Sequence, residues 1–241
     1  MKATLFKRQL AVLSILSASI GMSSAEASNY DETDAVSMGL KGPVAEVLIT
    51  TYDATVNTDG SYVQGDIQED SDARISFNPR GQVTFDVFGN EYNYDDSGAF
   101  VRGIEEYTKV TRDGQGRVHI YENMKDDEDD NCHKHTFNYD SSGRLISIEM
   151  LFWESETTFT YTYDGQSIYP SAMTMEEHNE GDIYRCTADF RYTKFDDHGN
   201  WTEREIHTVN VETSEPLGEN DVPESNTTES YSIESRDITY Y

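Results

Sequence analysis

A short pattern that joins two strands by a tight turn recurs along this chain of 241 residues. Each copy begins with an apolar residue, one residue of any kind and a residue that is usually aromatic. The turn follows, with Asp or Asn, two further residues and Gly. One residue of any kind and an apolar residue then begin the next strand. The turn pairs are Asn78 with Gly81, Asp95 with Gly98, Asp113 with Gly116, Asp140 with Gly143, and Asp196 with Gly199. A degenerate copy at Tyr163-Asp164 has Ser167 where Gly is expected.

The chemistry of the pattern predicts a structural turn. Asp or Asn at the first position of a type I turn caps the turn with its side chain, and Gly at the fourth position adopts the left-handed conformation that leads into the next strand. The flanking apolar residues alternate with period two and therefore point to one face of a sheet. We expect an all-β fold, an antiparallel meander of repeated hairpins that forms an elongated or curled sheet, as one domain over residues 39–241.

Further strands are expected outside the repeats. Val44–Tyr52 is strongly strand-like, and Tyr231–Tyr241 is expected to pair with the strand that begins at Trp201. Residues 212–229 are polar and contain prolines, which predicts a loop. No helix is predicted after residue 27.

The N-terminus has the features of a secretory signal over residues 1–27. Lys2, Lys7 and Arg8 form a basic segment, and Leu10–Met22 is a short apolar run. Ala25-Glu26-Ala27 is a cleavage site of the A-x-A type, and Ser23-Ser24-Ala25 is a second candidate site. The alternative is an N-terminal membrane anchor. Residues 28–38 are expected to be a polar leader. Export predicts a location in the periplasm or at the cell surface, with no membrane span after signal cleavage.

The charge of the chain limits its partners. There are 46 Asp and Glu against 18 Lys and Arg, a net charge of -28. Nucleic-acid binding needs clustered cations, so we do not expect this chain to bind nucleic acid. Two cysteines, Cys132 and Cys186, are compatible with one disulfide in an oxidising compartment or with two free buried thiols.

Possible metal sites are few, and no cofactor is expected. A run of carboxylates could bind calcium through oxygen ligands, although charge runs are usually solvated hairpin tips. Its members are Asp126, Asp127, Glu128, Asp129 and Asp130. Cys132, His133 and His135, near His119, could contribute to a zinc site, but a complete ligand set is missing and surface histidines are the simpler interpretation.

No catalytic motif is present: the chain has no nucleophile elbow, no His-Glu-x-x-His and no phosphate loop. The aromatic residues are the remaining functional candidates, because they could form a stacking surface for a glycan or a protein partner, or else the packed face of the sheet. These residues are Tyr121, Phe152, Trp153, Phe159, Tyr161, Tyr163 and Trp201.

The repeat resembles the YD repeats of the Rhs family and its bacterial cell-surface relatives. Tyr94-Asp95, Tyr139-Asp140 and Tyr163-Asp164 carry the signature dipeptide, with Gly98 and Gly143 at the expected offset. Residues 39–44 and 236–241 are similar to the two ends of small exported proteins of Bacteroidetes that have no assigned function. The resemblance implies an exported, non-catalytic structural or binding module. A toxin-enclosing shell needs many more repeats than are present here. The alternative function is a secreted carbohydrate-active hydrolase that uses paired carboxylates.

Overall fold

The structure is a computed structural model that describes residues 34–69, 72–86, 91–98, 100–103, 108–115, 117–123, 133–152, 155–179, 182–214 and 224–241. One short helix, α2 (Asp34–Ser37), precedes the strands. The strands are β1 (Val44–Val56), β2 (Tyr62–Ile67), β3 (Ala73–Phe77), β4 (Val83–Phe85), β5 (Tyr92–Tyr94), β6 (Phe100–Gly103), β7 (Thr108–Arg112), β8 (Val118–Asn123), β9 (His133–Tyr139), β10 (Leu145–Phe152), β11 (Ser155–Thr162), β12 (Ala172–Asn179), β13 (Asp182–Phe195), β14 (Trp201–Ser214) and β15 (Ser225–Tyr240).

The predicted all-β antiparallel meander is confirmed. A 13-stranded sheet has the order β4-β3-β1-β15-β14-β13-β12-β11-β10-β9-β8-β7, with β2 paired to the far half of β1. From β7 to β15 each strand pairs with its neighbour in sequence, and the pairing of β1 with β15 brings the two ends of the described chain together. The sheet does not close on itself, and β5 and β6 form a separate two-stranded sheet.

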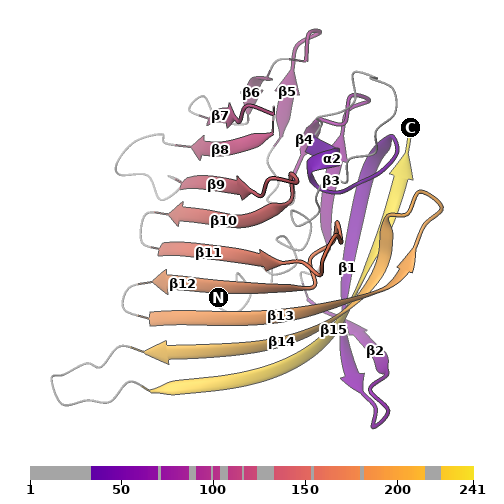
Figure 1. Cartoon of the computed structure of the whole chain (residues 1–241), viewed down its shortest axis with the longest axis vertical. Coiled ribbons are helices and arrows are strands. Elements are labelled where there is room, and N and C mark those ends of the chain that lie inside the picture. Colours follow the sequence, from indigo (N-terminus) through magenta and orange to yellow (C-terminus); the bar gives the residue numbers. More distant parts are fainter. Residues whose placement is uncertain are drawn as a thin grey trace, which may run out of the picture.

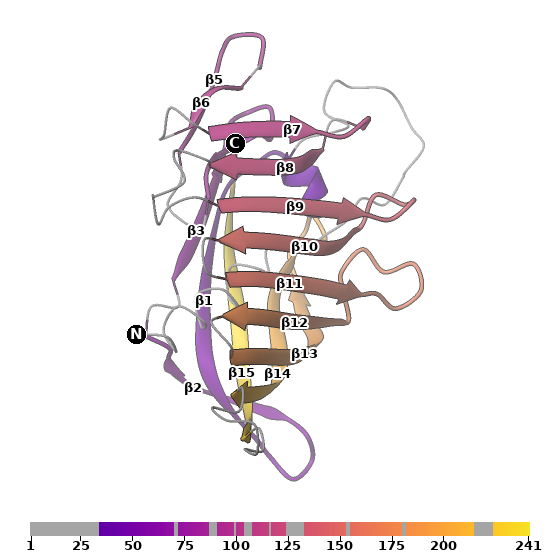
Figure 2. The ribbon, with the colours of Figure 1, turned by 90° about the vertical axis from the view of Figure 1, so that its left-hand side faces the viewer.

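The large sheet has a regular part and a bent part. We call β7–β12 the ladder, because these short strands lie side by side in order (Figure 1). The long strands β13, β14 and β15 continue the ladder and then sweep toward β1 (Figure 1). In the second view β1 runs steeply across the direction of the ladder strands (Figure 2). We call the region where the long strands bend the corner.

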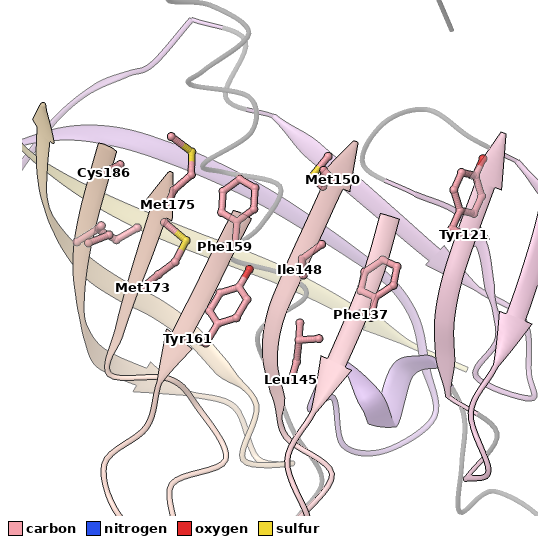
Figure 3. Close-up of a cluster of buried hydrophobic side chains, with 12 residues drawn as sticks. Tyr121, Phe137, Leu145, Ile148, Met150, Phe159, Tyr161, Met173, Met175 and Cys186 are labelled. Atoms are coloured by element: carbon pink, nitrogen blue, oxygen red, sulfur yellow. The ribbon is translucent and has the colours of Figure 1, made fainter. Parts of the chain in front are cut away.

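The inner face of the ladder is a hydrophobic core made of cross-strand rows. Phe137, Ile148, Phe159, Met175 and Cys186 stand opposite one another on five successive strands, β9 to β13. These residues are buried in one cluster (Figure 3). Because every second residue of each strand belongs to this face, the alternation seen in the sequence is the direct cause of the core.

A second core lies at the N-terminal end of the sheet. It contains Val47 and Ile49 of β1 and Ile75 of β3, and α2 adds Ala35, which is only 3% exposed. The expectations of a polar leader up to residue 38 and of no helix are therefore wrong for residues 34–38. Ala35 donates its backbone N–H to the Gly81 carbonyl at 2.9 Å, and this contact fixes the helical turn against the β3–β4 turn. Residues 28–33 lie outside the described residues.

The expected loop at residues 212–229 is also partly wrong. Strand β14 continues to Ser214 and β15 begins at Ser225, so the two pair from Glu203 opposite Ser235 to Thr213 opposite Ser225. The predicted pairing of the last strand with the Trp201 strand is present, but it is much longer than expected. Polar sequence misled the prediction because both faces at this end of the hairpin are solvated.

Candidate functional site

The turn after β9 shows how the repeated motif works. Oδ1 of Asp140 accepts the backbone N–H groups of Ser142 and Arg144, both at 2.8 Å. Gly143 has a φ of 84° and donates its N–H to the Asp140 carbonyl at 3.0 Å. The carboxylate is therefore used to hold its own turn.

The other copies have the same geometry where the structure describes them. Asn78, Asp95, Asp113 and Asp196 each accept the backbone N–H two residues later through Oδ1, at 2.9 Å in all four turns. Glycines with positive φ close three of these turns, namely Gly81, Gly98 and Gly199. Gly116 lies outside the described residues.

Arginine supports two of these carboxylates from the position directly after the glycine. The Nε of Arg144 donates to Oδ2 of Asp140 at 2.7 Å, and the Nε of Arg117 donates to Oδ2 of Asp113 at 2.8 Å. Partial burial raises the pKa of both aspartates, but the hydrogen bonds from arginine and backbone outweigh it and hold each pKa below its usual value. At neutral pH both aspartates are ionised and hydrogen-bonded within their own turns.

The same arginines link one hairpin to the next. The Arg117 guanidinium lies 4.1 Å from the centre of the Tyr139 ring, and that of Arg144 lies 4.7 Å from the Tyr163 ring. Each tyrosine also donates its hydroxyl to a backbone carbonyl of the preceding hairpin: Tyr139 to Val118 at 2.9 Å and Tyr163 to Leu145 at 2.7 Å. The Tyr-Asp dipeptide thus combines a link to the previous hairpin with a cap for its own turn.

In two other copies, the residue directly after the turn glycine also connects the turn to another segment of the chain. The sequence pattern allows any residue at this position. Gln82 donates to the Gly98 carbonyl at 2.7 Å, which fastens the β5–β6 turn to the β3–β4 turn. Asn200, which is 1% exposed, donates to the Lys41 carbonyl at 2.9 Å and accepts the Lys41 N–H at 2.8 Å. Sequence reasoning missed this role, because only the residue's partner in space reveals it.

A buried charged cluster occupies the corner. Arg204 of β14 stands opposite Glu234 of β15, and its Nη2 donates to the Glu234 carboxylate at 2.9 Å. The indole of Trp201 lies 4.7 Å from the Arg204 guanidinium and 3.5 Å from that of Arg236. All four residues are at most 4% exposed. Bulges between Tyr192 and Phe195 shift the register of β13 against β14 here, and such bulges bend strands.

Burial is the main influence on the pKa of Arg236. It lowers the pKa of this guanidinium to about 9, although the attraction of Glu234 raises it and the charge of Arg204 lowers it further. The Glu234 carboxylate and the two guanidinium groups therefore lie together inside the protein. Buried charges are costly unless they are paired and hydrogen-bonded, so the ion pair of Arg204 and Glu234 is important for the stability of this cluster.

A partly exposed cluster lies on the opposite, outer face of the same strands. Asp189, His207 and Tyr231 stand opposite one another on β13, β14 and β15. The rings of His207 and Tyr231 stack with centroids 4.8 Å apart, and the Tyr62 ring meets Tyr231 edge-on at 5.7 Å. Oε1 of Glu229 lies 2.7 Å from His207 Nε2 and accepts the Tyr231 hydroxyl at 2.6 Å. We call these five residues the outer-face cluster.

The outer-face cluster is solvated and polar. The side chains of Asp189 and Glu229 are 77% and 54% exposed. The hydrogen bond from Tyr231 lowers the pKa of Glu229, and the contact with His207 lowers it further. The rings are fixed by mutual packing, while two carboxylates face water. This arrangement can accept hydrogen bonds from a polar ligand. Its members are far apart in sequence, so only the strand register could have revealed them.

The predicted metal ligands are not brought together by what the structure describes. The run of Asp126, Asp127, Glu128, Asp129 and Asp130 lies outside the described residues. Among the described residues no group of three or more potential metal ligands is found. His133 and His135 share one face of β9 with ring centroids 5.0 Å apart, and His135 is buried, which lowers its pKa to about 3. His119 instead places Nδ1 2.9 Å from the Phe137 carbonyl oxygen.

The disulfide remains a prediction, and the structure describes only one of its cysteines. Cys186 is a buried free thiol, and burial raises its pKa to about 12. Cys132 lies outside the described residues. Its chain neighbour His133 is on β9, four strand spacings from Cys186 on β13, or about 19 Å at about 4.8 Å per spacing. A disulfide needs Cα atoms within about 7 Å, so the position of His133 argues against the bridge.

Most of the aromatic candidates belong to the packed face. Tyr121, Phe159, Tyr161 and Trp201 are at most 8% exposed, while Phe152 and Tyr163 pack against the ladder core. Trp153 lies outside the described residues. These rings therefore stabilise the sheet, and the half-buried tyrosines of the outer-face cluster were not among the candidates.

No protein-family model matches the chain, and no curated protein matches its sequence. Among the described residues, no helix is long and apolar enough to cross a membrane.

Proposed function

We propose that the chain is an exported, non-catalytic binding module of the periplasm or cell surface, built from YD-like hairpins, and that the outer-face cluster binds a glycan. The observation that supports this proposal is the fixed arrangement of the His207 and Tyr231 rings beside the exposed carboxylates of Glu229 and Asp189. Carboxylates accept hydrogen bonds from sugar hydroxyls, and tyrosine offers an apolar ring with a polar tip.

The charge of the chain limits which glycans could bind to it. The net charge of -28 repels acidic polysaccharides. Neutral sugars, or sugars with free amino groups, suit two exposed carboxylates better. A non-catalytic role is supported by the turn aspartates, because Asp113, Asp140 and Asp196 are each committed to their own turns.

The test is calorimetric titration of the mature chain with neutral and amino-sugar oligosaccharides. Tyr231→Phe and His207→Ala are expected to weaken binding at least about tenfold, the cost of one good hydrogen bond to a charged group. The matched control is His178→Ala, because His178 lies on the same sheet in an exposed pair with Glu176 and should leave binding unchanged.

Two outcomes would overturn the proposal. The first is that no saccharide binds, or that binding is unaffected in both cluster variants. The second is that mass spectrometry shows cleavage of the saccharide, which would favour the secreted hydrolase instead.

A further inference from the structure

The first half of strand β15 has a neighbouring strand on only one side among the described residues. Strand β1 pairs with β15 as far as Asp53 opposite Ser232, whereas residues 54–56 of β1 pair with β2. The segment from Ser225 to Tyr231 pairs with β14 on its other side. We call residues 225–231 the open edge, and this half of β15 forms the lower border of the sheet in Figure 1.

The direction of the backbone groups in the open edge follows from the pairing of β15 with β1. Tyr241 donates its N–H to the Pro43 carbonyl at 2.9 Å, so the backbone groups of Tyr241 face β1. The N–H and C=O of one residue point to the same side of a strand, and this side alternates along the chain. The register shift between β1 and β15 adds Ala45 to β1 and no residue to β15, so the alternation along β15 is unbroken. The residues of the open edge that face the side of β1 are therefore Ser225, Thr227, Glu229 and Tyr231.

A contact on the other side of β1 agrees with this direction. The Thr51 carbonyl accepts the Gln68 N–H at 2.9 Å and therefore points away from β15. Thr51 stands opposite Glu234, an even-numbered residue of β15. Even-numbered residues of β15 therefore face β14, and odd-numbered residues face the side of β1.

The open edge has none of the usual features that prevent another strand from pairing with it. Natural edge strands are protected by short length, by proline or lysine, or by bulges. The open edge spans seven residues, contains no Pro, Lys or Arg, and pairs with β14 without a register shift. Its residues from Ser225 to Ser230 are exposed. It is therefore suited to accept an additional strand along its whole length.

The charge around the open edge indicates which kind of strand fits. Residues 205–235 contain eight Asp and Glu and no Lys or Arg. A residue that pairs with Glu229 places its side chain on the outer face beside the Glu229 carboxylate, which is 54% exposed. Opposite charges across two strands stabilise a sheet, and like charges destabilise it. A basic strand therefore fits, whereas a second copy of this chain would bring the same acidic hairpin against itself.

We propose that the open edge binds an extended basic segment of a partner protein as an additional strand of the sheet. Main-chain hydrogen bonds to the odd-numbered residues supply the affinity, and Lys or Arg at every second position of the partner lies beside Glu229 on the outer face. The proposal rests on the backbone of residues 225–231, so it does not depend on the proposed binding of a glycan.

The first test measures amide hydrogen exchange by NMR in the mature chain without a partner. The amides of Asn226, Thr228 and Ser230 face β14 and should exchange slowly. The amides of Thr227 and Glu229 face the open edge and should exchange much faster. Slow exchange at Thr227 and Glu229 would overturn the proposal, because the edge would then already be covered.

The second test adds a synthetic probe, an acetylated and amidated peptide of about seven residues in which Lys and Val alternate. We expect saturable binding with a Kd below about 1 mM and at least about tenfold slower exchange of the Thr227 and Glu229 amides. The same peptide with Glu in place of Lys should not bind. Absence of binding by the basic peptide, or binding that leaves these two amides unprotected, contradicts the proposal.

A pair of variants at Thr227 separates strand addition from attraction by charge alone. Thr227→Pro removes an N–H that faces the open edge and none that faces β14, a position where strands tolerate proline. It should weaken binding of the basic peptide at least about tenfold. The matched control Thr227→Ala keeps the N–H and should bind as the wild type does. Equal binding by the two variants contradicts the proposal, and the exchange measurement on the wild-type chain does not depend on the folding of either variant.

Sedimentation of the free chain tests a second copy as the alternative occupant. We expect a monomer at micromolar concentrations, because the hairpin ends repel one another. A dimer whose formation protects the amides of Thr227 and Glu229 would overturn the proposal in favour of self-association.

Discussion

The ladder and the corner are parts of one sheet, but they are held together by different chemistry. In the ladder each contact is local: Asp140 caps its own turn, and Arg144 and Tyr163 connect that hairpin to the next one. In the corner the contacts join distant segments, since Arg204 and Glu234 are 30 residues apart and Asn200 binds Lys41 across 159 residues.

The difference separates two kinds of stabilisation. The ladder repeats a modest, solvated interaction, so the loss of one link affects one hairpin. The corner concentrates buried charge and aromatic rings where three long strands bend, so the loss of one partner leaves a charge inside the protein. We therefore expect substitutions in the corner to cost several times more than those in the ladder.

The largest effect is expected at Glu234. Glu234→Met removes the carboxylate that pairs with Arg204 inside the protein and should lower the free energy of unfolding by about 3–5 kcal/mol. Arg204→Met should cost less, because the Glu234 carboxylate keeps its attraction to the charge of Arg236. Denaturant titration measures both values. An equal loss in the two variants, or a loss below about 1 kcal/mol in Glu234→Met, would contradict this account.

Alkaline pH should next remove the stabilising contribution of two tyrosines at the corner, whereas Arg236, with its lowered pKa of about 9, contributes to the pH dependence in the opposite direction. Burial raises the pKa of Tyr169 and of Tyr240 to about 12 in the folded chain, although the charge of Arg236 opposes this shift at Tyr169, and the Asp196 carboxylate raises both values further. Tyrosine in the unfolded chain titrates near about 10. Their contribution to stability is therefore complete below pH 10 and is lost as the pH rises toward 12. Stability measured from pH 8 to 11 should fall less steeply in Tyr169→Phe. An unchanged slope would contradict the assignment.

Glycine substitutions provide a matched pair in the ladder. Gly143 has a φ of 84°, so Gly143→Ala should cost about 1 kcal/mol through the left-handed backbone. Gly114 lies in the neighbouring copy with open space around its α-carbon and a φ outside the left-handed region. Gly114→Ala should be neutral or slightly stabilising. Equal costs, measured by denaturant titration, would show that the turn geometry does not limit stability.

Adding a reductant is expected to have the smallest effect on stability. Since His133 lies about 19 Å from Cys186 by strand spacing, we expect both thiols to be free and Tm to be the same with and without reductant. Thiol titration of the denatured chain under non-reducing conditions should count two thiols per molecule. A count of zero together with a lower Tm in reductant would establish the bridge.

The two regions also differ in how far the sequence predicts them. The turn residues, the meander and the buried face of the ladder follow from a local pattern, because a turn and its two strands lie within a few residues of one another. The corner was not foreseen, because Arg204 and Glu234 are ordinary charged residues until the register of β14 and β15 places them together. The outer-face cluster was missed for the same reason: His207 and Tyr231 meet only across strands.

The central claim is that Arg144 links its own hairpin to the next one through Tyr163. A double-mutant cycle of Arg144→Met and Tyr163→Leu tests it most directly, with Arg117 and Tyr163, which lie in non-adjacent copies, as the control pair. The stacked pair should show a coupling free energy of about 0.5–1 kcal/mol, and the control pair should be additive within about 0.3–0.5 kcal/mol. Additive behaviour of Arg144 and Tyr163 would contradict the account, because the hairpins would then be joined by separate hydrogen bonds, from Arg144 to the Gly165 carbonyl and from Tyr163 to the Leu145 carbonyl, and not by the stacked pair.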